Sequence, residues 1–245
     1  MRKTLSDAFF ISKIRLLTIR RHLVSYLVVA LLTPLGITLI ISFAAGITEY
    51  AKVNYIIGTI VFSLSLSGIN GLGQDIAQDK LMGTLKWFIT MPIHPISYVI
   101  GLLTPHVIAG FANSLLIMFI GKYVWGAPIH ISLVVIPIFI LSILSMLGVG
   151  AVIGSYSKVP AQAYGLTNLL SFLIIIFSPV YYPIEALFPP LRFFAYILPT
   201  TYAAQALRYS FKGLTMDALR EITILGAIAA LLLIIGLSKI KWRET

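Results

Sequence analysis

Apolar residues are arranged in six long runs, which charged or turn-rich stretches separate. The runs without charged residues cover 22–48, 53–74, 87–121, 123–157, 159–184 and 222–238. A bilayer core about 30 Å thick needs roughly 20 helical residues at about 1.5 Å each, so each run can hold one crossing. Lys239 can snorkel to lengthen the shortest run, which is the last. We therefore predict an all-α membrane protein with six transmembrane helices, at about 23–47, 55–73, 99–120, 131–155, 165–182 and 220–238.

The composition supports this class of protein. Of the 245 residues, 59% are hydrophobic and 11% are charged, and the mean hydropathy of +0.98 is too high for an ordinary water-soluble domain. Cysteine is absent from the sequence, so neither a disulfide nor a cysteine-ligated metal is possible. The first apolar run is too long for a signal peptide and lacks a clear A-x-A site, so we expect a retained helix. We expect residues 1–245 to form a single transmembrane domain.

The net charge of +10 is explained by where the basic residues lie. Basic residues occur in 1–21, 74–98, 156–164 and 239–245, which six crossings place on one side of the membrane. The short opposite loops hold only Lys52 and Lys122, so the positive-inside rule places both termini in the cytoplasm. The other four basic residues lie in the long opposite segment 183–221, where the rule is weaker, and are Arg192, Arg208, Lys212 and Arg220. Topology and contact with anionic lipid account for the charge, and we expect no nucleic-acid partner. The expected location is the cytoplasmic membrane.

The N-terminal residues 1–22 have an amphipathic pattern. One helical side holds apolar residues, which are Leu5, Phe9, Leu16 and Ile19. The charged residues are spread around the remainder. This pattern favours an interfacial helix that lies on the cytoplasmic leaflet.

Residues 74–92 predict a second amphipathic helix on the cytoplasmic side, which Pro92 and Pro95 end. The apolar side consists of Ala77, Leu81, Leu85 and Phe88, and the opposite side of Asp75, Asp79, Gly83 and Lys86. The pattern alone leaves two hypotheses equally open: the helix rests on lipid, or its polar side meets a soluble partner. Asp75 and Asp79 share a face, but two carboxylates beside lysines are weak evidence for a metal site.

Residues 183–219 form a long segment on the expected outer side. Prolines at 183, 189, 190 and 199 interrupt the first half of this segment, and a further proline at 179 precedes it. Thr200 or Thr201 is expected to cap a helix that stops at Gly213. These pieces are too short to span and too apolar to stay in water. We therefore predict short re-entrant or interfacial helices on the outer face between the fifth and sixth crossings.

Polar residues are rare within the predicted crossings, whose cores hold no charged residue. They are Asn70, His106, Asn113, Gln162 and Asn168. Hydrogen bonds to neighbouring helices are the favoured interpretation, although His106 could relay a proton. Gly150 and Gly154 form a GxxxG pattern that favours close packing within the fold over a subunit interface or a substrate path. The sequence lacks Walker A, H-E-x-x-H and G-x-S-x-G motifs, so we expect no catalytic site.

Two stretches carry a resemblance to a known family. DKLMGTLKWFITMPI follows the second predicted helix and YYPIEALFPPLRFFAYILPTTYAAQALR follows the fifth. With the basic N-terminus and six helices, they resemble the membrane (permease) subunits of type-2 ABC exporters, in the drug- and lipid-exporting branch. The resemblance covers nearly the whole chain.

In that family the segment after the second helix is a coupling element, with an acidic-x-x-x-G-T-L-acidic pattern followed by T-P. Here Asp79 and Gly83 match, as do the two residues that follow Gly83. Lys86 stands where the family commonly has Glu, and Met91 separates Thr90 from the proline. The resemblance implies an ATPase-coupling segment at 74–92 that comprises Asp75, Asp79, Gly83, Thr84, Leu85, Lys86 and Pro92.

The second stretch matches a pattern of prolines, T-Y and arginine. Matching positions hold Pro183, Pro189, Leu191, Ala195, Pro199, Thr201, Tyr202 and Arg208. The resemblance implies that this segment has a gating or structural role on the outer face. The candidate residues for that role are Pro183, Glu185, Pro189, Pro199, Thr201, Tyr202 and Arg208.

The resemblance also implies partners. Two permease subunits, as a homodimer or heterodimer, would assemble with two soluble ABC ATPase subunits, which would bind the ATP and Mg; the permease itself would hold no cofactor. The substrate would be amphipathic or lipid-like and would cross between the permeases along the second and fifth helices. The alternative is a non-transporting membrane scaffold or a lipid-modifying enzyme that uses Glu185 and Arg192. A secondary transporter is a third hypothesis.

Overall fold

The computed structural model describes residues 2–21, 31–46, 48–91 and 93–238, and its regular secondary structure is entirely helical. The elements are α1 (Arg2–Arg21), α3 (Thr33–Ala45), α4 (Glu49–Ser65), the π-helix η2 (Leu66–Leu72), α5 (Gly73–Leu81), α6 (Thr84–Thr90), α7 (Pro95–Tyr123), α8 (Val135–Tyr156), α9 (Pro160–Phe177), the 3-10 helix η3 (Ile184–Ala186), α10 (Pro189–Ala195), α11 (Pro199–Phe211) and α12 (Thr215–Ser238). The prediction of an all-α protein is confirmed over these residues.

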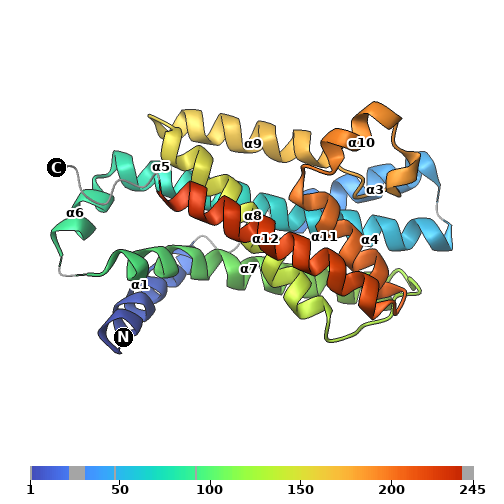
Figure 1. The fold of residues 1–245 in the computed structure, drawn as a ribbon, viewed down its shortest axis with the longest axis horizontal. Helices are drawn as coiled ribbons and strands as arrows, with labels where there is room; N and C mark the ends of the chain where they lie inside the picture. Colours follow the sequence, from blue (N-terminus) through green and yellow to red (C-terminus); the bar gives the residue numbers. More distant parts are fainter. Residues whose placement is uncertain (1, 22–30, 47, 92, 239–245) are drawn as a thin grey trace.

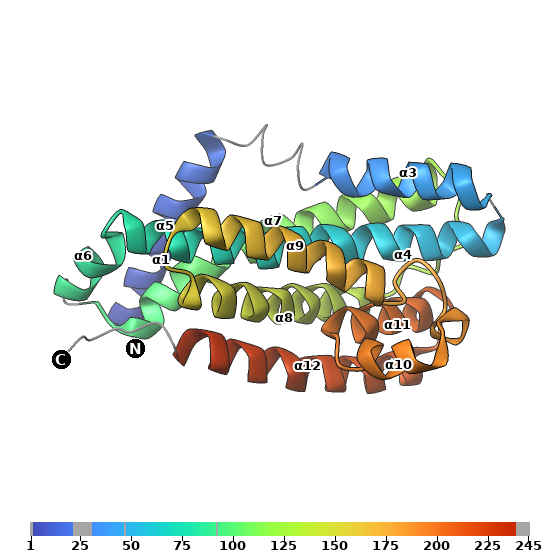
Figure 2. The same ribbon diagram turned by 90° about the horizontal axis from the view of Figure 1, so that it is seen from above.

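The long helices run side by side in an elongated bundle (Figure 1). One end carries α5, α6 and the start of α1, and we call it the α5–α6 end. The opposite end carries α10 and α11, and we call it the α10–α11 end. Helix α12 leads from the α10–α11 end back to the α5–α6 end, as both views show (Figure 2). The bundle therefore separates the two segments that the sequence singles out.

A single long helix forms the centre of the bundle. It runs from Glu49 to Leu81 through α4, η2 and α5. In the apolar 18-residue stretch of this helix, 89% of the residues are buried. Around it, α7 packs against α4 and α1, while α8 packs against η2 and α12. The central helix continues well past the boundaries of the predicted second crossing. The charged residues that follow that crossing therefore lie on the same helix.

Within the described ranges, four helices are long and apolar enough to cross a bilayer: Glu49–Leu81, Pro95–Tyr123, Val135–Tyr156 and Thr215–Ser238. They correspond to the predicted second, third, fourth and sixth crossings. The predicted first crossing contains the shorter apolar helix α3, which begins beside Pro34, and part of that crossing lies outside the described residues. The predicted fifth corresponds to α9, with 18 residues. The count of six crossings stays a prediction.

Small residues let η2 and α8 approach backbone to backbone. A Cβ atom at Gly150 would lie 2.7 Å from the carbonyl oxygens of Gly68 and Ile69, and one at Gly154 would lie 2.6 Å from Gly73 O. These distances leave no room for a side chain. The GxxxG pattern therefore serves packing within the fold, as predicted.

Helix α1 confirms the predicted N-terminal helix. It lies across the start of α7, where a Cβ at Gly101 would come within 2.4 Å of Ile11 Cγ2. Ala8 and Ile11 are buried in this contact, whereas Phe9 and Phe10 are exposed. The exposed apolar side is consistent with an interfacial position, which stays a prediction.

Candidate functional site

Asp79 on α5 is the centre of a polar cluster at the α5–α6 end. Its side chain is buried, with 5% of the residue exposed. Oδ2 of Asp79 accepts hydrogen bonds from Nη2 of Arg15 on α1 and, at 2.7 Å, from the hydroxyl of Tyr98 on α7. A buried carboxylate needs such partners, because burial without them is costly. Asp79 therefore ties three helices together.

Asp75 extends the cluster by one turn of α5. Its Oδ2 lies 3.1 Å from Nε2 of His106 on α7 and 3.9 Å from Nη1 of Arg15. Burial alone would lower the pKa of Arg15, but Asp79 and Asp75 outweigh it and raise that pKa above its ordinary value. The interpretation of His106 as a residue that bonds to a neighbouring helix is confirmed. Because the two carboxylates face Arg15 and His106, the geometry does not favour a cation between them.

Gly71 makes room for the His106 ring. A Cβ atom at this position would lie 2.5 Å from His106 Nδ1. The ring is buried, and Nδ1 has no hydrogen-bond partner among the described residues. The absence of a side chain at Gly71 thus lets the ring pack against η2.

Lys80 connects α5 to the end of α8. Its Nζ donates to the carbonyl oxygens of Gly154 at 3.0 Å and Ser157 at 3.5 Å, and also to that of Ser155. The last carbonyl groups of a helix have no hydrogen-bond partner within the helix, and they form the negative end of its dipole. An ammonium group at this position supplies the missing hydrogen bonds and interacts favourably with the dipole. Lys80 is thus a structural contact that the sequence did not predict.

The predicted amphipathic helix over 74–92 is two helices. Gly83 adopts φ +70°, in the left-handed region, and separates α5 from α6. A left-handed glycine ends a helix readily because it has no Cβ. The prediction of one continuous helix is therefore wrong at Gly83. Thr84 begins α6, while the side chains of Leu85 and Lys86 and the whole of Pro92 lie outside the described residues.

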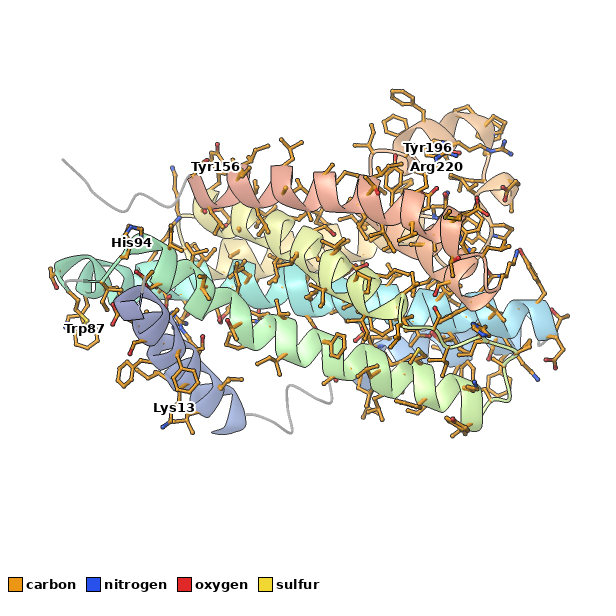
Figure 3. The ribbon with its side chains drawn as sticks, turned by 60° about the horizontal axis from the view of Figure 1, so that its bottom comes forward. Lys13, Trp87, His94, Tyr156, Tyr196 and Arg220 are labelled. Carbon is orange, nitrogen blue, oxygen red and sulfur yellow. The ribbon has the colours of Figure 1, made fainter. Side chains whose placement is uncertain are left out.

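The orientation of the segment also differs from the prediction. Asp79 points into the protein, whereas Leu81 and Met82 are 62% and 68% exposed. Trp87 on α6 is 61% exposed and projects from the end of the molecule (Figure 3). Phe88 is buried, with its ring 5.3 Å from that of Tyr98. Asp75 and Asp79 on the polar side are engaged by α1 and α7, whereas Leu81, Met82 and Trp87 are exposed.

Arg208 on α11 is the centre of the α10–α11 end. Its Nη2 donates to the carbonyl oxygens of Pro179 at 2.6 Å, Val180 at 3.1 Å and Tyr182 at 2.7 Å. Its Nε donates to Oδ1 of Asn54 on α4 at 2.9 Å. Burial lowers the pKa of Arg208 to about 10, so the guanidinium stays charged at neutral pH. Arg208 holds the turn after α9 against α11 and α4.

The threonines of this end do not cap α11. The helix begins at Pro199, its N-cap is Leu198, and no side chain caps it. Thr201 lies inside the helix, where its hydroxyl donates to Ala195 O at 2.5 Å and lies 3.2 Å from the Ser178 hydroxyl. The predicted cap is therefore wrong, because proline at the first helical position moves the start of the helix upstream. The helix does end before Gly213, which has φ +76°.

The remaining predicted residues of this end join its short pieces. Pro183 precedes η3 and Pro189 begins α10. The hydroxyl of Tyr202 donates to Tyr196 O at 2.8 Å. Arg192 donates to the carbonyls of Leu187 at 2.9 Å and Glu185 at 2.5 Å, and the side chain of Glu185 is exposed. Arg192 thus binds backbone rather than the Glu185 carboxylate, which does not favour a catalytic pair.

Sequence reasoning missed Arg15 and Tyr98 as partners of the 74–92 segment. They lie 64 and 19 residues from Asp79 along the chain. The sequence contained only an indirect indication of these partners. Acidic residues that directly follow an apolar helix need hydrogen-bond or charge partners if the fold buries them. It did not indicate which of the basic residues of 1–21 would supply one.

Comparisons with known proteins place the chain among transporters of one family. The family model described as ABC-2 type transporter matches residues 8–212. A protein of Escherichia coli strain K12 named probable multidrug ABC transporter permease YbhS is 24% identical over 190 residues, which cover 76% of this chain and 50% of that protein. Its counterpart from Escherichia coli O157:H7 matches to the same extent. The chain spans about half the length of these curated relatives.

Proposed function

The chain belongs to the ABC-2 type transporter family, and from this premise we propose that it is the permease subunit of an ATP-driven exporter. Soluble ABC ATPase subunits, in two copies, would bind ATP and Mg and energise it. The family match and the identity to a multidrug permease support this proposal. The α5–α6 end would then face the cytoplasm and the α10–α11 end the outer side.

The observation that carries the proposal is the shape of the α5–α6 end. Leu81, Met82 and Trp87 form an exposed apolar projection, which we call the α5–α6 knob. An exposed apolar cluster marks a surface that contacts another protein or the membrane, and the family match favours a protein here. Behind it, Asp79 and Lys80 are bonded to α1, α7 and α8. A force applied to the knob would be transmitted to these helices rather than absorbed in a loose loop.

The proposed substrate is amphipathic or lipid-like. It would pass between two permease subunits, in a homodimer or a heterodimer, along α4–η2 and α9. The side of α9 that includes Leu169 and Ile176 is exposed and apolar. It also carries Asn168, whose Oδ1 accepts a 2.7 Å hydrogen bond from Asn70. Such a surface offers apolar contact and weakly polar groups without fixed charge, which suits a substrate of this class.

Co-purification with candidate ATPase subunits tests the proposal. The permease with Leu81, Met82 and Trp87 changed to alanine should retain the ATPase at least tenfold more weakly than the unchanged chain. The matched control changes the exposed Phe193 and Phe194 of α10 to alanine at the opposite end, and should retain it fully. Equal retention by both variants would contradict docking at the knob.

A second measurement addresses transport itself. The reconstituted complex should show substrate-stimulated ATP hydrolysis and ATP-dependent flux that ionophores do not abolish. Flux that collapses with the ion gradient and ignores ATP would instead favour a secondary transporter. A chain that binds no ATPase subunit and moves no substrate would favour a scaffold.

A further inference from the structure

A small pocket lies at the α10–α11 end, beside the start of α4. Its volume is about 210 Å³. The start of α4, the loop before α8 and the end of α11 form its walls, which are lined by Glu49, Tyr50, Val53, Asn54, Pro128, Arg208, Phe211 and Lys212. Two hydrogen bonds join the loop before α8 to the end of α11: His130 N donates to Phe211 O at 2.9 Å, and the Ser132 and Ser210 hydroxyls lie 3.1 Å apart.

The pocket holds more positive than negative charge. The carboxylate of Glu49 is engaged by Lys52, with 2.6 Å between Oε1 and Nζ. Arg208 and Lys212 are left without a carboxylate within 4.0 Å in the part of the chain that the structure describes. Two cations thus line a small cavity whose one acidic residue is already paired. This arrangement favours an anion.

Arg208 has one edge of its guanidinium available. Nε and Nη2 donate to Asn54 and to the backbone of the turn after α9, but Nη1 has no hydrogen bond to any described residue. Asn54 donates to Tyr50 O at 3.2 Å, which directs its Oδ1 toward Arg208 and fixes the guanidinium plane. The free edge is therefore held in place before any ligand arrives. A preorganised guanidinium edge is well suited to phosphate.

Lys212 provides a second donor on the rim. Its Nζ lies 6.0 Å from the centroid of the Tyr50 ring, within the range of a cation–π contact. Tyr50 and Lys212 both line the pocket, and Nζ of Lys212 makes no hydrogen bond to any described residue. The side chains of Val53 and Phe211 supply an apolar wall beside the two cations.

We propose that this pocket binds one phosphate group, held by Nη1 of Arg208 and Nζ of Lys212. The volume is below the roughly 300 Å³ at which pockets for drug-sized ligands begin, so a headgroup fits and a transported drug does not. A phosphate can come from a phospholipid headgroup or from a soluble phosphate ester, and the chemistry of the pocket is the same for both. The proposal stands independently of the ATPase partner and the substrate.

The test measures binding of two phosphate probes to the purified full-length chain. Phosphatidylglycerol in nanodiscs represents the lipid source, and glycerol 3-phosphate added to protein in phosphate-free detergent represents the soluble source. Phosphatidylcholine, whose phosphate is balanced by its own cation, is the reference lipid. Retention is counted by native mass spectrometry, and the thermal midpoint is recorded in parallel.

Lys212→Gln is the principal variant, because Lys212 is exposed and its loss leaves the Arg208 bonds intact. We expect it to lose about tenfold in affinity for phosphatidylglycerol, with Lys212→Arg close to the unchanged chain. The matched control is Lys122→Gln at the end of α7, which does not line the pocket and should bind normally. Arg208→Lys should also weaken binding, and is assessed only if its thermal midpoint in phosphatidylcholine is unchanged.

The outcomes separate the sources. Retention of phosphatidylglycerol alone assigns the pocket to lipid, whereas competition by glycerol 3-phosphate assigns it to a soluble phosphate; both support the site when Lys212→Gln weakens them. Equal retention of the two lipids without any effect of glycerol 3-phosphate would overturn the proposal. So would equal losses in Lys212→Gln and Lys122→Gln, because the effect would then be one of surface charge.

Discussion

The hydroxyl of Tyr98 donates a 2.7 Å hydrogen bond to Oδ2 of Asp79, the same oxygen that Arg15 contacts. This one carboxylate joins the N-terminal helix, the end of the central helix and the start of α7. The segment from Gly73 to Thr90 is therefore held on its inner side by charge and presents an apolar knob on its outer side. The proposed coupling role requires that this attachment be strong.

The first prediction concerns the Arg15–Asp79 pair. Arg15→Met leaves a buried carboxylate and Asp79→Leu leaves a guanidinium without its main partner. Each should lower the free energy of unfolding by about 3 kcal/mol, since removal of one member of a buried pair strands the other charge. The double variant should recover at least half of the summed loss, because no charge is stranded. Denaturant unfolding in detergent measures all three.

Additive losses in this cycle would contradict the pairing. Lys13→Met serves as the control on the same helix, because Lys13 is exposed and should change stability by less than about 0.5 kcal/mol.

The second prediction concerns the space that Gly71 leaves for His106. Gly71→Ala places a methyl group 2.5 Å from the ring nitrogen Nδ1, so the ring or the helix must shift. We expect a loss of about 1–3 kcal/mol in the free energy of unfolding, as for other overpacked cores. Gly165→Ala on α9 is the matched control, because a Cβ there meets nothing within 4 Å. The control should be neutral or slightly stabilising.

Equal effects of the two glycine changes would show that helix propensity, rather than the ring, decides the outcome. A His106→Ala background sharpens the comparison. There Gly71→Ala should cost less, since the methyl group occupies part of the space that the ring vacates.

The sequence predicted the all-α class, the helix at 1–22, and the packing role of Gly150 and Gly154, because each depends on local periodicity or on residue size. Hydrophobic runs indicate where helices lie regardless of their neighbours. The ends were less accurate: the central helix extends to Leu81 rather than to about residue 73. A polar residue can stay helical when partners from elsewhere satisfy it, and those partners are not visible locally.

The orientation of the 74–92 segment could not be predicted from the sequence either, because the partners that determine it lie elsewhere in the chain. The helical wheel separates Asp79 from Leu81 correctly, but it does not state which side faces the protein. That choice was decided by Arg15, 64 residues away, and by Tyr98. Solvent-facing acids are the ordinary case, and a buried acid requires a specific cation at the right place. Long-range pairing of this kind is a property of the fold rather than of the segment.

The third prediction compares the two arginines of the α10–α11 end. Arg208→Met removes the donors of three carbonyls and of the buried Asn54 amide oxygen, and should cost about 3 kcal/mol in the free energy of unfolding. Arg192→Met removes two hydrogen bonds to backbone carbonyls that lie only five and seven residues away in the chain. It should cost about 1 kcal/mol in the free energy of unfolding. Thermal and denaturant unfolding in the same detergent measure both. A larger loss for Arg192 would contradict the central role of Arg208.

The fourth prediction uses the conformation of Gly83 to separate shape from size. A Cβ atom at Gly83 would meet nothing within 4 Å, yet φ is +70°. Gly83→Ala and Gly83→Leu should therefore cost the same, about 1–2 kcal/mol, because the left-handed backbone and not the side-chain volume is penalised. Gly83→Asn should cost less, since asparagine tolerates this region.

The same three variants test coupling in the complex with the ATPase subunits. If the turn at Gly83 positions the α5–α6 knob, substrate-stimulated ATP turnover should fall least in Gly83→Asn. It should fall further, and to the same level, in Gly83→Ala and Gly83→Leu, while the isolated permease stays folded. Thermal midpoints of the isolated chain provide the control for folding. A steep decline with side-chain size, from Ala to Leu, would show instead that a partner surface packs directly on Gly83, because the isolated chain leaves that space open.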